Sequence, residues 1–127
     1  ATLVESYARV VDLRDADLVD VIFCVGGRKF GGLRRVLALR CPAIGRLLLG
    51  DSEEACEAST VQLVEFDATP RAFRQFLFYL HVGQCSLDSV SDVIGLFEVA
   101  EQLGVAELQE ACADYLHKAE IADELIA

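Results

Sequence analysis

One stretch, residues 20–48, constrains the fold of this 127-residue chain more than any other. It opens with the apolar run Val21–Val25, passes through Gly26-Gly27 and a second short segment, and then becomes basic and apolar. An apolar run without alternation predicts a strand covered on both faces, and a Gly-Gly pair supplies the positive φ of a tight hairpin. Pro42 interrupts the helical pattern that follows, so the stretch predicts a β-hairpin and then two short helices.

The amino-terminal residues predict an amphipathic helix. Thr2 and Glu5 have the spacing of a capping box. The apolar stripe of the helix consists of Leu3, Tyr7 and Val10, flanked by Val4 and Val11. The stripe ends by Leu13, and residues 14–18 form a polar connection to the first strand. Such a helix can pack on its own domain or exchange onto a second copy.

Residues 61–66 alternate in the way of a half-buried strand, and a helix with a strong apolar stripe follows. Thr69 and Pro70 mark its start and Gly83 its end. The side chains that we expect to be buried are Phe73, Phe76, Leu77 and Leu80.

Two further helices complete the pattern. Ser89 opens the first and Gly104 ends it. Its expected inward side chains are Val90, Val93, Ile94, Phe97 and Ala100. The last helix spans residues 106–118, and residues 120–127 add a turn or fray. Three strands among about six helices predict an α+β domain.

Charge and composition exclude several functional classes. The net charge is −10, but the stretch between Val21 and Gly50 contains six basic residues and no acidic one. This basic stretch is either ordinary solvated charge or a basic face for an acidic partner. The overall charge repels phosphate, so we expect no nucleic-acid binding. Apolar residues make up 54% of the chain, and we expect part of this surplus to cover a partner.

No apolar run approaches the ~20 residues of a membrane span, and the amino terminus lacks a signal-peptide pattern. We therefore expect a soluble, non-secreted protein, in the cytoplasm or the nucleus. Because the chain does not begin with Met, we expect it to be part of a longer protein.

The five cysteines contain no CxxC pair and no cysteine–histidine cluster of zinc-site spacing. An odd number of thiols favours a reducing compartment. Cys24, Cys41 and Cys112 lie in apolar patterns and are expected in the core, whereas Cys56 lies in a polar loop and is expected to be exposed.

Catalytic patterns are missing from the sequence. His81 and His117 are the only histidines, and neither has a recognisable nucleophile partner. Gly26-Gly27 and Gly31-Gly32 lack the remainder of a phosphate-binding motif, so we interpret them as turn glycines. The sequence therefore predicts no enzyme, no cofactor and no metal site.

Several motifs occur together in a fixed order. They are Asp20 before the first strand, Phe30 ten positions later, Arg34, Val36-Leu37-Ala38, Cys41-Pro42-Ala43-Ile44, the strand 61–66, Pro70 to Phe73, His81-Val82-Gly83, and Leu108, Cys112 and Leu116. This order resembles the BTB/POZ domain, a protein-interaction module, over about residues 18 to 117. Leu33, Cys41 and His81-Val82 replace the family's usual His, Ser and Tyr-Thr, which bears on the subfamily.

The resemblance implies a helical cluster capped by a small three-stranded sheet. The predicted domain covers residues 1–118, with a dimerisation helix at 1–13, a core at 20–117 and an extension at 119–127. In this family the amino-terminal helix commonly exchanges in a homodimer, and an acid and a base meet in a charged pocket near the interface. The expected dimer residues are Leu3, Tyr7, Val10, Val11, Asp20 and Arg34.

Many members of the family bind cullin-3 and carry a second domain that captures the protein to be ubiquitinated. The cullin contact includes an apolar-x-Glu motif after the second short helix, where this chain has Ser52-Glu53-Glu54. The candidate cullin-binding residues are Leu48, Leu49, Ser52, Glu54 and His81. The alternatives are a transcription regulator whose dimer groove recruits a co-repressor, a scaffold without cullin binding, and a potassium-channel tetramerisation domain.

Overall fold

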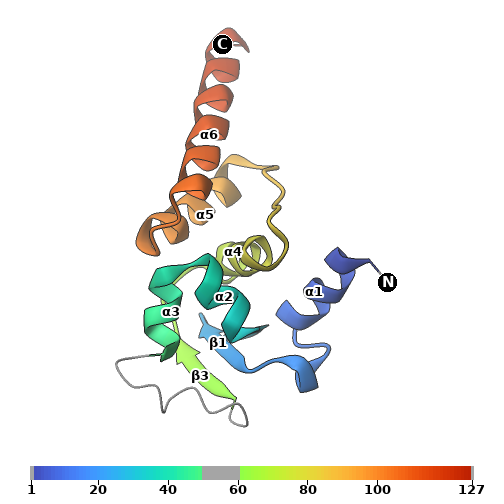
Figure 1. Cartoon of the computed structure of the whole chain (residues 1–127). Coiled ribbons are helices and arrows are strands. Elements are labelled where there is room, and N and C mark those ends of the chain that lie inside the picture. The colour runs from blue at the N-terminus through green and yellow to red at the C-terminus, as the bar shows by residue number, and fades with distance from the viewer. Residues whose placement is uncertain (1, 50–60, 127) are drawn as a thin grey trace.

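The computed structural model describes residues 2–49 and 61–126 (Figure 1). The elements are α1 Leu3–Val11, a short 3-10 turn Ala16–Leu18, β1 Val21–Val25, β2 Arg28–Gly32, α2 Arg34–Arg40, α3 Pro42–Leu49, β3 Gln62–Glu65, α4 Pro70–Val82, α5 Val90–Gln102 and α6 Ala106–Ile126. The α+β class, the hairpin and the two short helices around Pro42 are therefore confirmed. None of the described helices combines the length and apolar character that a membrane span requires.

The sheet has the order β2-β1-β3, with β1 antiparallel to β2 and parallel to β3. Gly26 and Gly27 turn the hairpin with φ values of 55° and 81°, as their sequence predicts. The prediction that β1 is covered on both faces is wrong. Its inward side chains are fully buried, but Ile22 and Cys24 on the other face stay partly exposed. Beside Ile22 on that face lies Leu63 of β3, which is 69% exposed.

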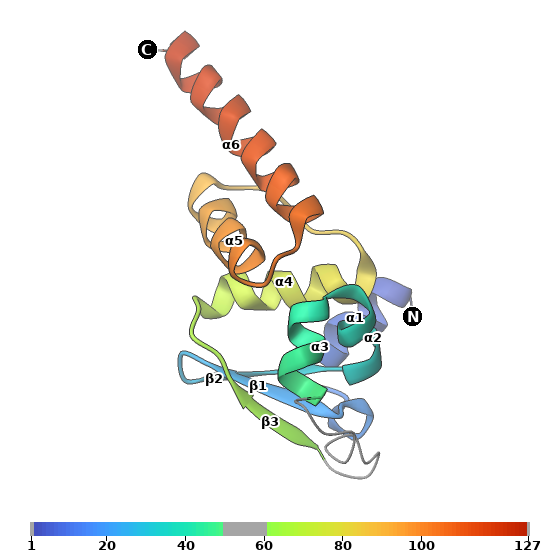
Figure 2. The ribbon, with the colours of Figure 1, turned by 60° about the vertical axis from the view of Figure 1, so that its left-hand side comes forward.

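An aromatic cluster joins the sheet to α4. The Phe73 ring lies 5.1 Å from the ring of Phe23 on β1 and 4.9 Å from that of Phe66, and Phe76 extends the cluster along α4. Figure 2 shows α4 between the sheet on one side and α5 with α6 on the other. All four side chains predicted as the buried stripe of this helix are at most 1% exposed, so the stripe is confirmed.

The predicted inward stripe of α5 is partly wrong. Val93 and Ala100 are buried as expected, but Val90 is 45% and Ile94 44% exposed, and Phe97 is only half-buried. The reason is a close approach of two helices, because a Cβ added at Gly95 would lie 3.1 Å from the Ala72 Cβ of α4. This contact turns a neighbouring line of side chains inward, and its buried members are Val93, Leu96, Val99 and Ala100.

Helix α6 begins inside the domain and then leaves it. Leu108 and Cys112 are buried, as is Cys41, whose thiol lies 3.5 Å from the Leu103 carbonyl oxygen. The prediction that Cys24 is a core residue is wrong, because Cys24 lies half-exposed on the sheet. The helix continues to Ile126, beyond the predicted end at residue 118. Figures 1 and 2 show its carboxyl-terminal part projecting away from the other elements.

Candidate interaction surfaces

Helix α1 is docked by its second half and exposed at its first. The predicted capping box is present, because the Glu5 N–H donates to the Thr2 Oγ1 at 3.1 Å and the Thr2 N–H donates to the Glu5 carboxylate at 3.3 Å. Val10 and Val11 are buried within this chain, whereas Leu3 is 68% exposed. Of the four apolar residues predicted at a dimer interface, Leu3 and the half-buried Tyr7 therefore retain surface for a partner.

An ion pair that the sequence analysis missed fastens the end of α1 to α4. The Arg74 guanidinium donates to both oxygens of Asp12, at 2.7 and 2.9 Å. This two-pronged contact holds the pKa of Asp12 below its usual value and raises the pKa of Arg74. The two residues are 62 positions apart, so no local spacing in the sequence indicates the pair.

The predicted acid and base, Asp20 and Arg34, do meet. Asp20 Oδ1 accepts the backbone N–H of Arg34 at 2.6 Å, and its Oδ2 lies 3.6 Å from the Arg34 Nε. Arg34 is 7% exposed, so its charge lies almost wholly inside the protein. The pair fixes the start of α2 against the start of β1.

His81 completes this cluster from α4. The backbone N–H of Leu33 donates to its Nε2 at 3.2 Å, and its Nδ1 lies 2.7 Å from the carbonyl oxygen of Leu77. The ring is 7% exposed and lies 5.5 Å from the ring of Tyr7 on α1. Burial lowers the pKa of His81, against smaller opposing effects of the Leu77 carbonyl and the Asp20 carboxylate. His81 is thus an internal residue, and the structure gives it no surface on which to meet cullin-3.

Of the other predicted cullin-binding residues, Leu48 is the one whose side chain the structure describes. Leu48 is 1% exposed and belongs to the core. The side chain of Leu49 and residues Ser52 and Glu54 lie outside the described part of the structure, as does Cys56.

The neighbouring Leu47 is instead 48% exposed and lines a groove of about 390 Å³. The groove runs between α3 and the end of α5, and the residues lining it are Ala43, Arg46, Leu47, Phe66, Gln102 and Leu103. The motif match pointed to the adjacent Leu48 and Leu49, and nothing in the apolar run Leu47–Leu49 indicates which of its side chains stays exposed.

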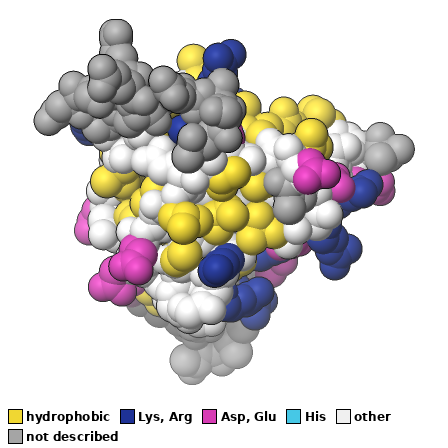
Figure 3. All heavy atoms as spheres, turned by 90° about the horizontal axis from the view of Figure 1, so that it is seen from below, with side chains coloured by type: hydrophobic (Ala, Val, Ile, Leu, Met, Phe, Trp, Pro, Cys, Tyr) yellow, Lys and Arg dark blue, Asp and Glu magenta, His cyan; other side chains and the backbone are white. Residues whose placement is uncertain are grey.

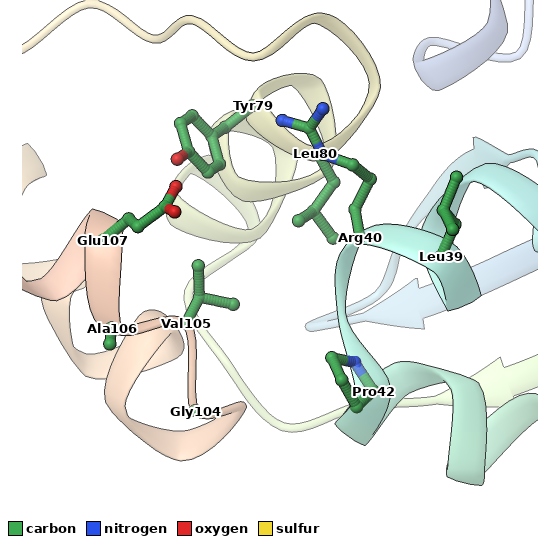
Figure 4. A pocket seen from close by; sticks show the side chains of 9 residues that line it. All are labelled: Leu39, Arg40, Pro42, Tyr79, Leu80, Gly104, Val105, Ala106 and Glu107. Atoms are coloured by element: carbon green, nitrogen blue, oxygen red, sulfur yellow. The ribbon is translucent and has the colours of Figure 1, made fainter.

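A second hollow, of about 500 Å³, lies between the end of α2, α4 and the α5–α6 turn (Figure 4). Figure 4 shows the Tyr79 hydroxyl directed toward the Glu107 carboxylate, with Arg40 reaching over from α2. Burial and the nearby Glu107 raise the pKa of Tyr79, so its hydroxyl stays protonated and can donate a hydrogen bond. Leu39, which also lines this hollow, is 84% exposed.

The underside of the sheet is a third exposed apolar area. Figure 3 shows hydrophobic side chains gathered on the face seen from below, bordered by basic and acidic ones. Leu63 and Ile22 are paired in the β1–β3 register, so their side chains lie side by side on the exposed face of the sheet. Within residues 2–49 and 61–126, no three His, Cys, Asp or Glu side chains gather in a way that could hold a metal ion.

Comparison with known proteins gives one family throughout. The family model described as "BTB/POZ domain" matches residues 11–120. The human BTB/POZ domain-containing protein 9 is 29% identical over 76% of this chain and 16% of its own length. Human Kelch-like protein 24 is 30% identical over 84% of this chain and 17% of its own length. Human zinc finger and BTB domain-containing protein 39 is 28% identical over 75% of this chain and 13% of its own length.

The chain thus spans about one sixth of the length of the curated relatives it matches. Two solved structures share the fold. The BTB domain of human Gigaxonin has a TM-score of 0.61 at 19% identity, with 88% of this chain and 92% of that one covered. The BTB domain of zebrafish PATZ1 has a TM-score of 0.63 at 17% identity, covering 93% of this chain and 97% of that one.

Proposed function

This chain belongs to the BTB/POZ domain family, a family of protein-interaction domains, and we propose that it is the homodimerising module of a cullin-3 ubiquitin ligase substrate adaptor. The observation that supports the proposal is the exposed groove beside α3, the helix that directly precedes the segment to which the family resemblance assigns the cullin contact. The similarity to Kelch-like protein 24 supports the same class, since kelch repeats indicate an adaptor that captures a client. An adaptor of this kind works in the cytoplasm or the nucleus.

The groove has the composition of a small protein-binding surface. Leu47 and Phe66 give it apolar walls, while Arg46 and Gln102 supply polar groups at its border. An apolar centre with a polar rim is the usual arrangement of protein interfaces. The apolar position of the cullin motif is Ser52 in this chain, and in our proposal Leu47 supplies the apolar contact instead.

Binding to the amino-terminal domain of cullin-3 tests the adaptor proposal. We expect the chain to bind at tens of micromolar or tighter, and Leu47→Glu to weaken binding by about tenfold or more, since burying the exposed half of a leucine is worth roughly 1–1.5 kcal/mol. Leu39→Glu is the matched control, because Leu39 is even more exposed but lies on α2. Wild-type protein that is not retained at this concentration excludes the adaptor role.

The homodimer is the second part of the proposal. Leu3 and Val4 at the start of α1 are 68% and 43% exposed, which leaves an apolar end on the helix that the family uses for pairing. We expect light scattering at micromolar concentration to give twice the monomer mass, and Leu3→Asp to shift the mass toward the monomer. Val90→Asp is the control, because Val90 is similarly apolar and 45% exposed but lies on α5. A monomer mass for the wild-type protein refutes the dimer.

A transcription regulator is the alternative that one observation favours. The hollow of Figure 4 offers apolar surface at Leu39 together with Arg40 and the Tyr79 hydroxyl, a combination suited to an extended co-repressor segment. The similarity to a zinc finger and BTB domain-containing protein agrees with this class. The Leu39→Glu and Leu47→Glu variants separate the two functions, because each alters one of the two hollows. A dimer that binds neither partner is a scaffold module.

A further inference from the structure

We propose that His81 is a proton-operated latch for α1: its neutral ring holds α1 on the domain, and protonation of the ring releases the helix. The inference deepens the proposed function, because α1 is the helix to which we assign the dimer contact. The release itself is a property of one chain, and it can be measured whether or not the chain pairs.

The hydrogen bonds of His81 use both ring nitrogens in opposite senses. Nε2 accepts the Leu33 N–H, so it carries no hydrogen, and Nδ1 must then be the protonated nitrogen, which donates to the Leu77 carbonyl. A second proton would have to bind at Nε2. The new Nε2–H would point at the backbone N–H of Leu33, the N-cap residue of α2, so two hydrogen-bond donors would face each other. The charged ring cannot keep its present place.

The His81 ring of α4 lies against α1, β2 and Leu33 at the start of α2, and α1 is the element that can yield. The Tyr7 ring of α1 lies 5.5 Å away, and a Cβ added at Gly32 of β2 would lie 3.6 Å from the ring's Cε1. Strand β2 is paired in the sheet and α4 lies in the core, whereas residues 3–6 in the first half of α1 are exposed. An imidazolium that moves toward water on the α1 side displaces Tyr7 and loosens the helix.

The charges around the ring do not prevent this. Asp20 attracts a protonated His81, but the Asp20 carboxylate already accepts the Arg34 N–H and lies beside the Arg34 guanidinium, which repels a second cation. From α1 the facing group is the Tyr7 ring, from α4 the Leu77 carbonyl, and from β2 the uncharged Gly32. The cluster therefore favours the neutral ring, in agreement with the lowered pKa of His81.

The sign and range of the effect follow from proton linkage. A released, hydrated His81 titrates near its ordinary pKa of 6.5, whereas the docked ring has a lower pKa. Docking is thus at full strength above about pH 6.5 and weakens as the pH falls toward the docked pKa, by up to about tenfold per pH unit in the docking equilibrium. The Asp12–Arg74 pair does not add to this change, because the pKa of Asp12 lies below its ordinary 3.8.

The experiment uses the fact that the chain has only two histidines, His81 and His117. Amide hydrogen exchange of the whole chain is measured between about pH 5 and pH 7.5, and the protection factors of α1 are corrected for intrinsic exchange rates. In wild-type protein we expect protection of residues 6–11 to fall by up to about tenfold per pH unit below pH 6.5, while protection in α4 changes little.

Two variants assign the effect. His81→Gln keeps an acceptor for the Leu33 N–H but does not titrate, and should make α1 protection independent of pH in this range. His117→Gln removes the exposed histidine of α6 and should behave as the wild type does. Wild-type protection that is constant with pH overturns the proposal, as does a decline that persists in His81→Gln.

Ring nitrogen NMR of the wild-type protein gives a readout that survives if His81→Gln fails to fold. We expect the Nδ1–H tautomer of His81 at neutral pH, and a ring titration whose midpoint coincides with the change of the α1 signals. The Nε2–H tautomer, or two unrelated midpoints, contradicts the latch. Mass measured in the same samples separates this result from the dimer: a monomer at every pH refutes the dimer alone.

Discussion

Replacing Gly31 by alanine tests how tightly the end of α1 is fitted onto the sheet. Gly31 pairs with Ile22 in the middle of the hairpin. A Cβ at this position would lie 2.5 Å from the Val10 carbonyl oxygen, 2.7 Å from the Leu13 Cδ2 and 2.7 Å from the Val19 Cγ1. A contact with a backbone oxygen cannot be relieved by rotating a side chain. The segment also has little freedom, since Leu13 already has a φ of 60°.

Two routes bound the cost of Gly31→Ala. If the connection shifts in place, overpacking of this kind costs about 1–3 kcal/mol. If α1 detaches, the chain loses the burial of Val10 and Val11, which is worth about 3–4 kcal/mol at roughly 1.5–2 kcal/mol for each valine. The chain follows the cheaper route, so we expect a loss of about 1–3 kcal/mol. At about 4 °C per kcal/mol for a domain of this size, the melting temperature falls by about 4–12 °C.

Gly45→Ala in α3 is the matched control, with the opposite expected sign. Its new Cβ would meet Ala38 at 3.4–3.5 Å, which is close to ordinary contact, and Gly45 is a helical residue. Alanine is favoured over glycine inside a helix by about 0.5–1 kcal/mol, so this variant should be slightly stabilised. Denaturant unfolding and exchange of the α1 amides are the measurements. A Gly31→Ala protein that unfolds as the wild type does, with α1 equally protected, refutes the close docking of α1.

Three further predictions concern the core, the ion pair and the thiols. Phe73→Ala removes the centre of the aromatic cluster and should lower the free energy of unfolding by about 3–5 kcal/mol. Leu63→Ala on the exposed sheet face should change it by under about 0.5 kcal/mol. Equal losses in the two variants would contradict the burial of Phe73 and the exposure of Leu63. Asp12→Asn should lower the free energy of unfolding by about 0.5–1 kcal/mol at neutral pH, since the ion pair is partly exposed. In acid unfolding, this difference from the wild type should vanish as the pH falls through the lowered pKa of Asp12, which lies below 3.8. A difference that persists at such low pH would exclude the ion pair as its source. Cys112 is fully buried, and burial raises its pKa to about 11. Mass spectrometry after alkylation of the native protein near neutral pH should therefore find Cys112 unmodified. Labelling at the rate of a free thiol would show that α6 opens.

The sequence predicted best where one element carries a single, unambiguous stripe. Helix α4 starts at Pro70, ends at Gly83 and carries one apolar line, as the sequence predicts, although the Thr69 side chain makes no cap hydrogen bond. Helix α5 has apolar residues on more than one line, so periodicity alone could not choose between them. The choice is made by the approach of Gly95 to Ala72, a contact between two helices that only the folded chain defines.

The polar contacts around α1 likewise include one pair that the sequence predicted and two that it did not. Asp20 and Arg34 were singled out because both match a motif of the family, and they do form a pair. No motif includes Asp12 with Arg74 or His81 with the Leu33 backbone, whose partners are 62 and 48 positions apart. Interactions of this separation arise from packing, and a single sequence carries no local signal of them.

The apolar surplus of the composition has a specific distribution in the fold. The exposed leucines lie on different elements, with Leu3 on α1, Leu18 on the short 3-10 turn, Leu39 on α2, Leu47 on α3 and Leu63 on β3. Figure 1 shows α1 and α3 on opposite sides of α2, so the exposed first half of α1 and the α3 groove lie on different parts of the surface. The pairing that we propose through α1 and the capture that we propose at α3 therefore use separate surfaces. A module that must be dimeric and bind a second protein at the same time requires this separation of surfaces.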